Sequence, residues 1–336
     1  MKPLGWPLRL ALFGVGGTIF VVLVRRVGLG ELVSNAASIG WVFLPVLAVY
    51  GLMLLCNAWA WHLSLAAEAR RPPFGHLLAL TTAGAALNYV TPMINAGGEP
   101  YRIAGLAPWI GPQRATASVI LIRLLNTLAL IITWVLALAL ALLLLPLAGA
   151  PRWVAVGALA LSAGLGLVVL AGHRRGLLTP ILDLVVALPL IGRATRRLER
   201  WRATLAEMDR QIIEFYHLSP RRFFQALGIE VVARTLFLSE YYLIGLGLGI
   251  AIDFPTAYLI GGIASLVQNV VFLIPYELGV KEGTLYYLFA LAGMTGEQGL
   301  YTALVIRARD LAWVGLGLLV MGLVPHDRPA PTTAVS

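Results

Sequence analysis

The chain has 336 residues, of which 59% are hydrophobic and only 12% charged, and its mean hydropathy is +0.85. Soluble domains carry roughly 25% charged residues, so this composition excludes a soluble globular protein and indicates an integral membrane protein. The net charge of +9 comes mainly from arginine and indicates orientation and contact with anionic lipids, because no nucleic-acid-binding module accompanies it. The single cysteine, Cys56, excludes an intrachain disulfide and a metal site built from several cysteines.

Leucine- and alanine-rich runs without strand-like alternation predict an all-α polytopic membrane protein. A membrane span needs about 20 apolar residues. The first such run begins at Pro7 and lacks the small-residue cleavage site of a signal peptide, so we interpret it as a retained helix. The predicted spans are residues 7–24, 41–65, 115–145, 153–171, 224–250 and 300–323.

Two further apolar stretches end at proline-bearing breaks. Leu77–Met93 runs into TPMINAGGEPYR, and Phe254–Ile274 is followed by PYELGVKEG. The apolar returns after these breaks, at about 103–110 and 284–292, are too short to cross a bilayer. We therefore expect two re-entrant helical hairpins instead of two further pairs of spans. The predicted hairpin breaks contain Pro92 and Pro275.

A basic segment at residues 193–218 separates the two halves of the chain. Its apolar residues recur at alternating spacings of three and four from Leu198 to Phe215, and five arginines lie on the other face of the predicted helix. Two interpretations remain: an amphipathic cytoplasmic helix on anionic headgroups, or a helix docked on the protein's own loops. The positive-inside rule places this segment in the cytoplasm, and counting spans from it places both termini there too. Arg25 and Arg26 then fall outside, against the rule.

Polar residues repeat between the two halves. Glu99 lies seven positions after a proline, and so does Glu282, at an offset of 183. Downstream, SVILIRLLN at 118–126 aligns with TALVIRARD at 302–310, at an offset of 184. Because the two halves start on opposite sides of the membrane, we predict inverted repeats, each made of span, re-entrant hairpin and span. The predicted organisation is a single transmembrane domain at 1–324 with repeat A at 41–145, a linker with a span and the basic helix at 153–218, and repeat B at 224–323, then a disordered tail at 325–336.

Charged residues gather near the two hairpin breaks. Ionisable residues inside spans are costly and usually face the interior or a cavity. A glycine-bearing hairpin tip offers free backbone N–H groups and half-helix ends that hold ions, and arginines suit a phosphate because the guanidinium fork matches its oxygens. The predicted substrate-binding residues are Asn88, Gly97, Gly98, Glu99, Arg102, Arg123, Asn126, Asn269, Glu277, Gly279, Lys281, Glu282, Arg307, Arg309 and Asp310.

Some of these charges have a purely structural alternative. Arg123 and Arg307 also suit ion pairs that only lock two helices together. Glu230 and Arg234 stand at i, i+4 on one predicted helix, and this spacing by itself predicts a local ion pair.

At the hairpin motifs the chain resembles the lysylphosphatidylglycerol synthase transmembrane family of flippase-like membrane proteins. The family's first motif, Gly-Gly-Glu followed by an arginine, is matched by GGEPYR at 97–102 of this chain. Its second motif, P-G-G-x-G-V-R-E, is matched by PYELGVKE at 275–282, with Tyr276-Glu277 in place of the glycine pair. The resemblance covers about 10–323 and favours the first hairpin for the headgroup contact. No aminoacyl-transferase domain follows Val324, so the resemblance implies lipid translocation and not lipid synthesis.

We therefore expect a flippase of the cell (cytoplasmic) membrane that moves a lipid or lipid-linked substrate through a midplane cavity. Its headgroup would bear a phosphate or be zwitterionic. The alternative is an ion- or proton-coupled carrier for a small soluble solute, with a sealed vestibule instead of a groove open to the bilayer. A non-transporting accessory protein is less favoured, and so is a membrane enzyme, because the five aspartates and five histidines are scattered. We expect no catalytic residue, metal or cofactor. Membrane lipids are the expected partners, with anionic headgroups at 193–218, and a homo-oligomer is left open.

Overall fold

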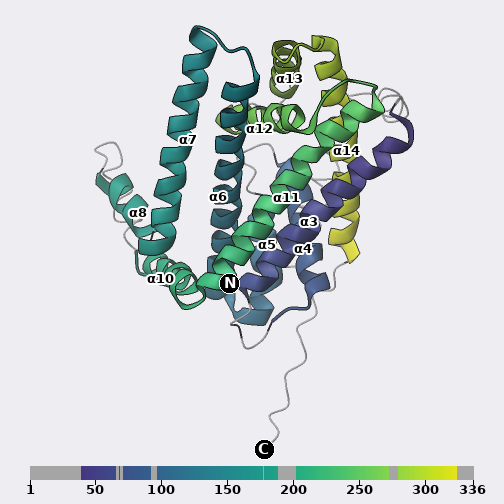
Figure 1. The fold of residues 1–336 in the computed structure, drawn as a ribbon. Coiled ribbons are helices and arrows are strands. Elements are labelled where there is room, and N and C mark those ends of the chain that lie inside the picture. The colour runs from purple at the N-terminus through teal and green to yellow at the C-terminus, as the bar shows by residue number, and fades with distance from the viewer. Residues whose placement is uncertain are drawn as a thin grey trace, which may run out of the picture.

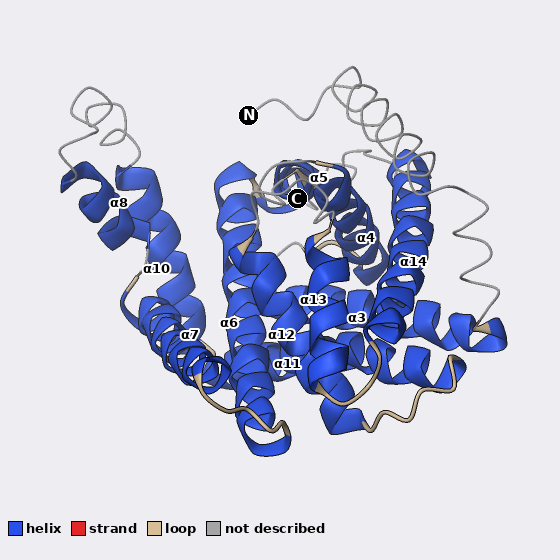
Figure 2. Ribbon diagram, turned by 90° about the horizontal axis from the view of Figure 1, so that it is seen from above, coloured by secondary structure: helices blue, strands red, loops and turns tan. Residues whose placement is uncertain are grey.

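The computed structural model describes residues 39–65, 68, 71–91, 97–176, 178–187, 202–271 and 279–323. Within these residues the protein is all-helical, as the sequence predicts, with eleven α-helices, one 3-10 turn and no strand (Figures 1 and 2). The predicted first span at 7–24 and the predicted tail at 325–336 lie outside the described residues.

The helices follow the predicted apolar stretches closely. In chain order they are η1 (Gly40–Val42), α3 (Phe43–Ser64), α4 (Phe74–Val90), α5 (Gly98–Ile110), α6 (Pro112–Leu144), α7 (Ala150–Arg175), α8 (Leu178–Ala187), α10 (Arg202–Leu218), α11 (Pro220–Gly247), α12 (Phe254–Val270), α13 (Val280–Leu291) and α14 (Gly296–Leu323).

Three described helical segments are long and apolar enough to cross a membrane: Gly40–Ser64, Pro112–Leu144 and Ala150–Gly172. They coincide with three of the predicted spans, and they make the chain a membrane protein by composition and length. Helices α11 and α14 have 28 residues each, about 42 Å at 1.5 Å per residue. They fall outside this apolar class because each carries several charged side chains, among them Glu230, Arg234 and Glu240 in α11 and Arg307, Arg309 and Asp310 in α14.

Helices of the first half pack mainly on helices of the second half. In Figure 1, α3 and α11 lie side by side along most of their length, and Met53 and Leu54 of α3 pack with Ala233 of α11. Helix α4 packs on α14, and α12 packs on α6. Each half therefore completes its core with the other half.

Two glycines allow close contact between the halves. A Cβ at Gly317 of α14 would lie 2.6 Å from the Cβ of Ala86 in α4, and a Cβ at Gly262 of α12 would collide with Ala137 of α6. Real Cβ atoms do not approach so closely, so any larger residue would push the helices apart. The α4–α14 and α12–α6 contacts thus have the same form: glycine on one helix and alanine on the other.

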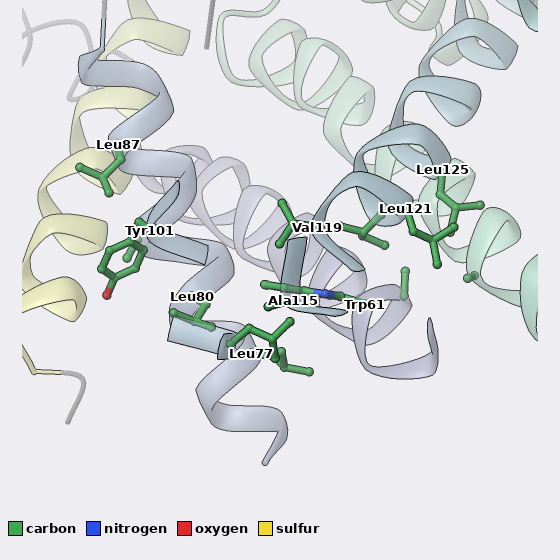
Figure 3. Close-up of a cluster of buried hydrophobic side chains, with 14 of the residues drawn as sticks. Trp61, Leu77, Leu80, Leu87, Tyr101, Ala115, Val119, Leu121 and Leu125 are labelled. Atoms are coloured by element: carbon green, nitrogen blue, oxygen red, sulfur yellow. The ribbon is translucent and has the colours of Figure 1, made fainter. Parts of the chain in front are cut away.

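The first hairpin is fixed against α3 and α6 by a buried apolar cluster (Figure 3). Trp61 of α3 lies within it, and its Nε1 donates a hydrogen bond to Ser118 Oγ of α6 at 2.9 Å. Gly105 of α5 leaves room for Leu80 of α4, because a Cβ there would collide with the leucine side chain. The packing therefore holds α4 and α5 against each other and beside α6.

Helices α7, α8 and α10 lie to one side of α6 (Figures 1 and 2). Exposed apolar side chains such as Trp153, Leu161 and Leu167 cover α7, as expected of a lipid-facing helix. The described part of the predicted basic helix, α10, docks on α8: the buried carboxylate of Asp209 accepts hydrogen bonds from the backbone N–H and hydroxyl of Thr179, at 2.8 and 2.7 Å. Docking on the protein's own helices therefore describes α10, and its contact with anionic headgroups stays a prediction.

Candidate functional site

Glu99, in the first turn of α5, gathers the polar residues of the first hairpin. Asn88 Nδ2, near the end of α4, donates to Glu99 Oε1 at 3.3 Å, and Asn88 Oδ1 accepts from the backbone N–H of Gly98 at 2.6 Å. The guanidinium groups of Arg102 and Arg123 each lie 3.7 Å from the same Glu99 oxygen. The structure thus brings together five of the predicted site residues from three helices.

The glycine pair of this hairpin is required by the hairpin's own packing. A Cβ at Gly97 would collide with Thr91, and a Cβ at Gly98 would collide with the backbone carbonyl of Gly84 in α4. The side chain of Arg102 crosses the same glycine, where a Cβ at Gly84 would also collide with it. Helices α4 and α5 therefore meet backbone to backbone, and this contact fixes where Glu99 and Arg102 lie.

The polar side chains of the first hairpin and α6 that gather at Glu99, here called the first hairpin group, carry more positive than negative charge. Glu99 faces two guanidinium groups, and the undescribed residues 92–96 of the tip, PMINA, add no charged side chain. The side chains of Arg102 and Glu99 are 14% and 20% exposed, whereas that of Arg123 is 48% exposed. Arg123 lies about 8 Å from the midpoint of the 33-residue helix α6. A half-exposed positive charge therefore stands near the middle of an apolar span.

Asn126 lies one turn beyond Arg123 on α6 and bridges two charges of α11. Its Nδ2 donates to Glu230 Oε2 at 2.9 Å, and its Oδ1 accepts from Arg234 Nη2 at 2.6 Å. The i, i+4 spacing predicted a direct ion pair between Glu230 and Arg234. That prediction was incomplete because both side chains turn toward α6, where one amide offers a donor to the carboxylate and an acceptor to the guanidinium.

The second hairpin group has the same glutamate–arginine pairing as the first. Glu282, in the first turn of α13, forms an ion pair with Arg307 of α14, and its Oε2 accepts from the backbone N–H of Gly279 at 2.9 Å. Lys281 Nζ lies 3.3 Å from Asp310 Oδ2. Gly279 has a φ of +81°, a conformation that glycine adopts without strain and that starts helix α13 sharply.

Arg309 is locked inside the helix bundle. Its guanidinium lies 2.5 Å from both Glu240 Oε1 of α11 and Asp310 Oδ1, and its Cζ lies 4.4 Å from the centre of the Tyr50 ring and 5.1 Å from that of Phe237. Its side chain is only 1% exposed. This arrangement ties α14 to α3 and α11, so a ligand would reach Arg309 only by breaking two buried ion pairs.

Three of the predicted site and break residues, Pro92, Pro275 and Glu277, lie outside the described residues. Asn269 joins neither group, because its Nδ2 donates to Ser265 O of its own helix at 2.8 Å.

Sequence reasoning missed several groups that the structure places at the two clusters. The carbonyl of Thr81 accepts a hydrogen bond from Arg102 Nη2 at 3.2 Å, and the backbone of Gly84 packs directly against Gly98. The run TTAGAA at 81–86, which is unusually rich in small residues, is the signal for this close contact. Nothing in the sequence pairs the aromatic rings of Tyr50 and Phe237 with Arg309.

Comparison with known proteins agrees with the hairpin motifs. The family model described as the lysylphosphatidylglycerol synthase TM region matches residues 8–318, nearly the whole chain. No curated protein and no solved structure matches the chain. Because the family match spans both hairpins and the helices that pack on them, the chain belongs to the lysylphosphatidylglycerol synthase transmembrane-region family.

Proposed function

We propose that the protein is a flippase that moves a lipid or lipid-linked substrate with a phosphate-bearing headgroup between the leaflets of the cell membrane. The half-exposed guanidinium of Arg123 near the middle of α6 carries this proposal. An arginine facing lipid tails at that depth costs about 2.5–3.5 kcal/mol or more, so it needs water or an anion beside it. The guanidinium fork matches the oxygens of a phosphate, and a zwitterionic headgroup presents the same group.

The charge of the first hairpin group favours an anionic ligand. Arg102 and Arg123 share the single carboxylate of Glu99, which leaves one positive charge for a phosphodiester. Glu99 lies 3.7 Å from both guanidinium groups and holds the two arginines in place. A headgroup phosphate would take over the contact with Arg123, the more exposed of the two, while the acyl chains stay in the bilayer.

Inverted repeats give this site a route between the leaflets. Several features support them: the equivalent α4–α14 and α12–α6 contacts, the matching Glu99–Arg123 and Glu282–Arg307 pairs, and the position of the two hairpins toward opposite ends of the molecule in Figure 1. Helices α5 and α13 have 13 and 12 residues, about 20 and 18 Å, and are too short for a hydrocarbon core of about 30 Å. Two re-entrant hairpins that rock against each other would expose the site to each leaflet in turn.

Reconstituted vesicles test this function directly. Vesicles containing a phospholipid with a fluorescent headgroup receive a membrane-impermeant quencher, and the quenched fraction reports lipid that has changed leaflet. We expect wild type to translocate the lipid and Arg123→Gln to lose at least about tenfold in rate, because the lost charge-assisted hydrogen bonds contribute about 1.5–3 kcal/mol. Arg114→Gln is the matched control on the same helix, since Arg114 forms an exposed pair with Glu68 at 3.1 Å.

Two outcomes would overturn the proposal. Wild-type vesicles that translocate no phosphate-bearing lipid would remove the flippase, and equal rates for wild type and Arg123→Gln would remove the site. Uptake of a soluble phosphate ester by the same vesicles, without lipid movement, would instead support the solute carrier.

A further inference from the structure

Glu230 is a buried carboxyl group that the translocation site does not yet explain. It lies about 5 Å from the midpoint of α11 and is 1% exposed. Its Oε2 accepts one hydrogen bond, from the neutral amide of Asn126, and its Oε1 is buried without a hydrogen-bond partner in the described structure. An ionised carboxylate buried this way costs several kcal/mol, and a protonated carboxyl group costs much less.

Glu240 provides a comparison on the same helix. It is also 1% exposed, but its Oε1 lies 2.5 Å from Arg309, which neutralises it directly. The cation nearest in sequence to Glu230, Arg234, donates to the carbonyl oxygen of Asn126 instead. Of these two equally buried glutamates, Glu230 is therefore the one without a directly paired cation among the described residues.

The groups that face Glu230 come from four helices. Arg234 is on its own helix, Asn126 comes from α6, Arg102 from α5 and Cys56 from α3. Arg102 connects Glu230 to the headgroup site, because its guanidinium lies 3.7 Å from Glu99 Oε1 and its charge also acts, more weakly, on Glu230. Its Nε is also buried without a hydrogen-bond partner in the described residues. Arg123 and Asn126 stand three residues apart on one face of α6, so one helix face contacts both carboxylates.

We propose that Glu230 is the proton-coupling residue of the translocation site and that one proton moves with each phosphate-bearing headgroup in the same direction. This inference rests on the proposed flippase function. A proton from the water on one side adds to the Glu230 carboxylate and gives a carboxylic acid. With that negative charge gone, Arg102 and Arg123 attract the phosphate more strongly, and by linkage the bound phosphate favours the proton. After the hairpins rock, phosphate and proton leave together on the other side.

A pH gradient across the vesicles tests this coupling. With one proton per lipid, a gradient of one pH unit corresponds to about tenfold enrichment of the labelled lipid in the leaflet on the alkaline side. We expect this enrichment in wild type and in the surface control Glu68→Gln. In Glu230→Gln the lipid should distribute about equally, because glutamine keeps the shape of the side chain but binds no proton.

The possible failures are distinguishable. Absence of any lipid movement in wild type contradicts the flippase itself, whereas movement without enrichment in wild type, or enrichment retained in Glu230→Gln, contradicts proton coupling at Glu230. An infrared difference spectrum decides the matter without transport: wild type should show a protonated-carboxyl band that titrates with pH and that Glu230→Gln removes. If Glu230→Gln does not fold, Asn126→Ala replaces it and should move the midpoint of that band to more alkaline pH, since the carboxylate loses its hydrogen-bond donor. A band that is absent, or unaffected by these variants, overturns the proposal.

Discussion

Replacing Arg309 by methionine should destabilise the protein by about 3–5 kcal/mol without acting through the headgroup site. Arg309, Lys281, Glu240 and Asp310 form a buried group whose two positive and two negative charges cancel. Removal of Arg309 leaves a net negative charge in the bundle. Asp310 keeps Lys281 at 3.3 Å, so the unbalanced charge falls on Glu240, which loses its ion-pair partner.

The loss of aromatic contacts adds to this cost. The guanidinium of Arg309 lies 4.4 Å from the Tyr50 ring centre, and a desolvated contact of this kind contributes up to about 2 kcal/mol. Methionine fills much of the arginine volume and has no charge, so packing loss is kept small. The loss of stability therefore reports mainly the cost of leaving the Glu240 carboxylate unpaired, and only to a small extent the cost of a cavity.

The double variant Arg309→Met, Glu240→Gln separates these causes. It removes one charge of each sign and leaves the Lys281–Asp310 pair intact, so it should recover most of the stability lost by Arg309→Met. Unfolding of purified protein in detergent, followed by tryptophan fluorescence in increasing denaturant, measures both variants against wild type. The reasoning fails if Arg309→Met is as stable as wild type, or if the double variant is less stable than the single one. Normal stability combined with lost translocation would assign Arg309 to the substrate, as the sequence predicted.

Two further predictions concern a glycine contact in the first hairpin and the N-terminal cap of α12. Gly98→Ala should lower the free energy of unfolding by about 1–3 kcal/mol and slow translocation, because its Cβ collides with the backbone carbonyl of Gly84. The control Gly283→Ala has open space around its Cβ and should leave stability unchanged or raise it. Equal unfolding midpoints for the two variants would refute this. Asp253→Ala should lower the free energy of unfolding by about 1 kcal/mol, because the Asp253 carboxylate caps α12 by accepting a hydrogen bond from Thr256 N at 2.9 Å. Hydrogen bonds from the Thr256 hydroxyl and backbone lower the pKa of Asp253, so its contribution is present above the ordinary carboxyl range and lost as pH falls through the lowered pKa. A stability difference that persists unchanged in acid would contradict the capping role.

The periodicity of the sequence predicted the helices well, because apolar runs in a membrane protein leave few alternatives to a helix. It also placed Glu99 and Arg123 among the predicted site residues, but it did not pair them with each other. Simple helix geometry separates Arg307 from Arg309: at about 100° per residue they point to nearly opposite sides, one toward α13 and the other toward α3 and α11. Grouping both as substrate-binding residues overlooked that angle.

Long-range polar contacts were beyond the sequence. The partner that links Glu230 to Arg234 is Asn126, 104 residues from the glutamate, and local spacing carries no information about it. The sequence suggested that the glycine pair at 97–98 lets a ligand approach the backbone. Only the position of the Gly84 carbonyl shows that packing uses the space at Gly98.

The two glutamate–arginine pairs differ in exposure, and under the proposed function this difference favours the first hairpin as the binding site. Glu99–Arg123 and Glu282–Arg307 are equivalent pairs, yet Arg307 is 5% exposed and Arg123 is 48% exposed. The position that matches Arg102 at the offset of 183 is Leu285, which is fully buried. Since the second arginine is what gives the first hairpin its surplus charge, the proposed repeats would hold two similar scaffolds, of which the first keeps a positive charge for a phosphate. Under the proposed function, one headgroup bound at the first hairpin is therefore the expected stoichiometry of a transport cycle.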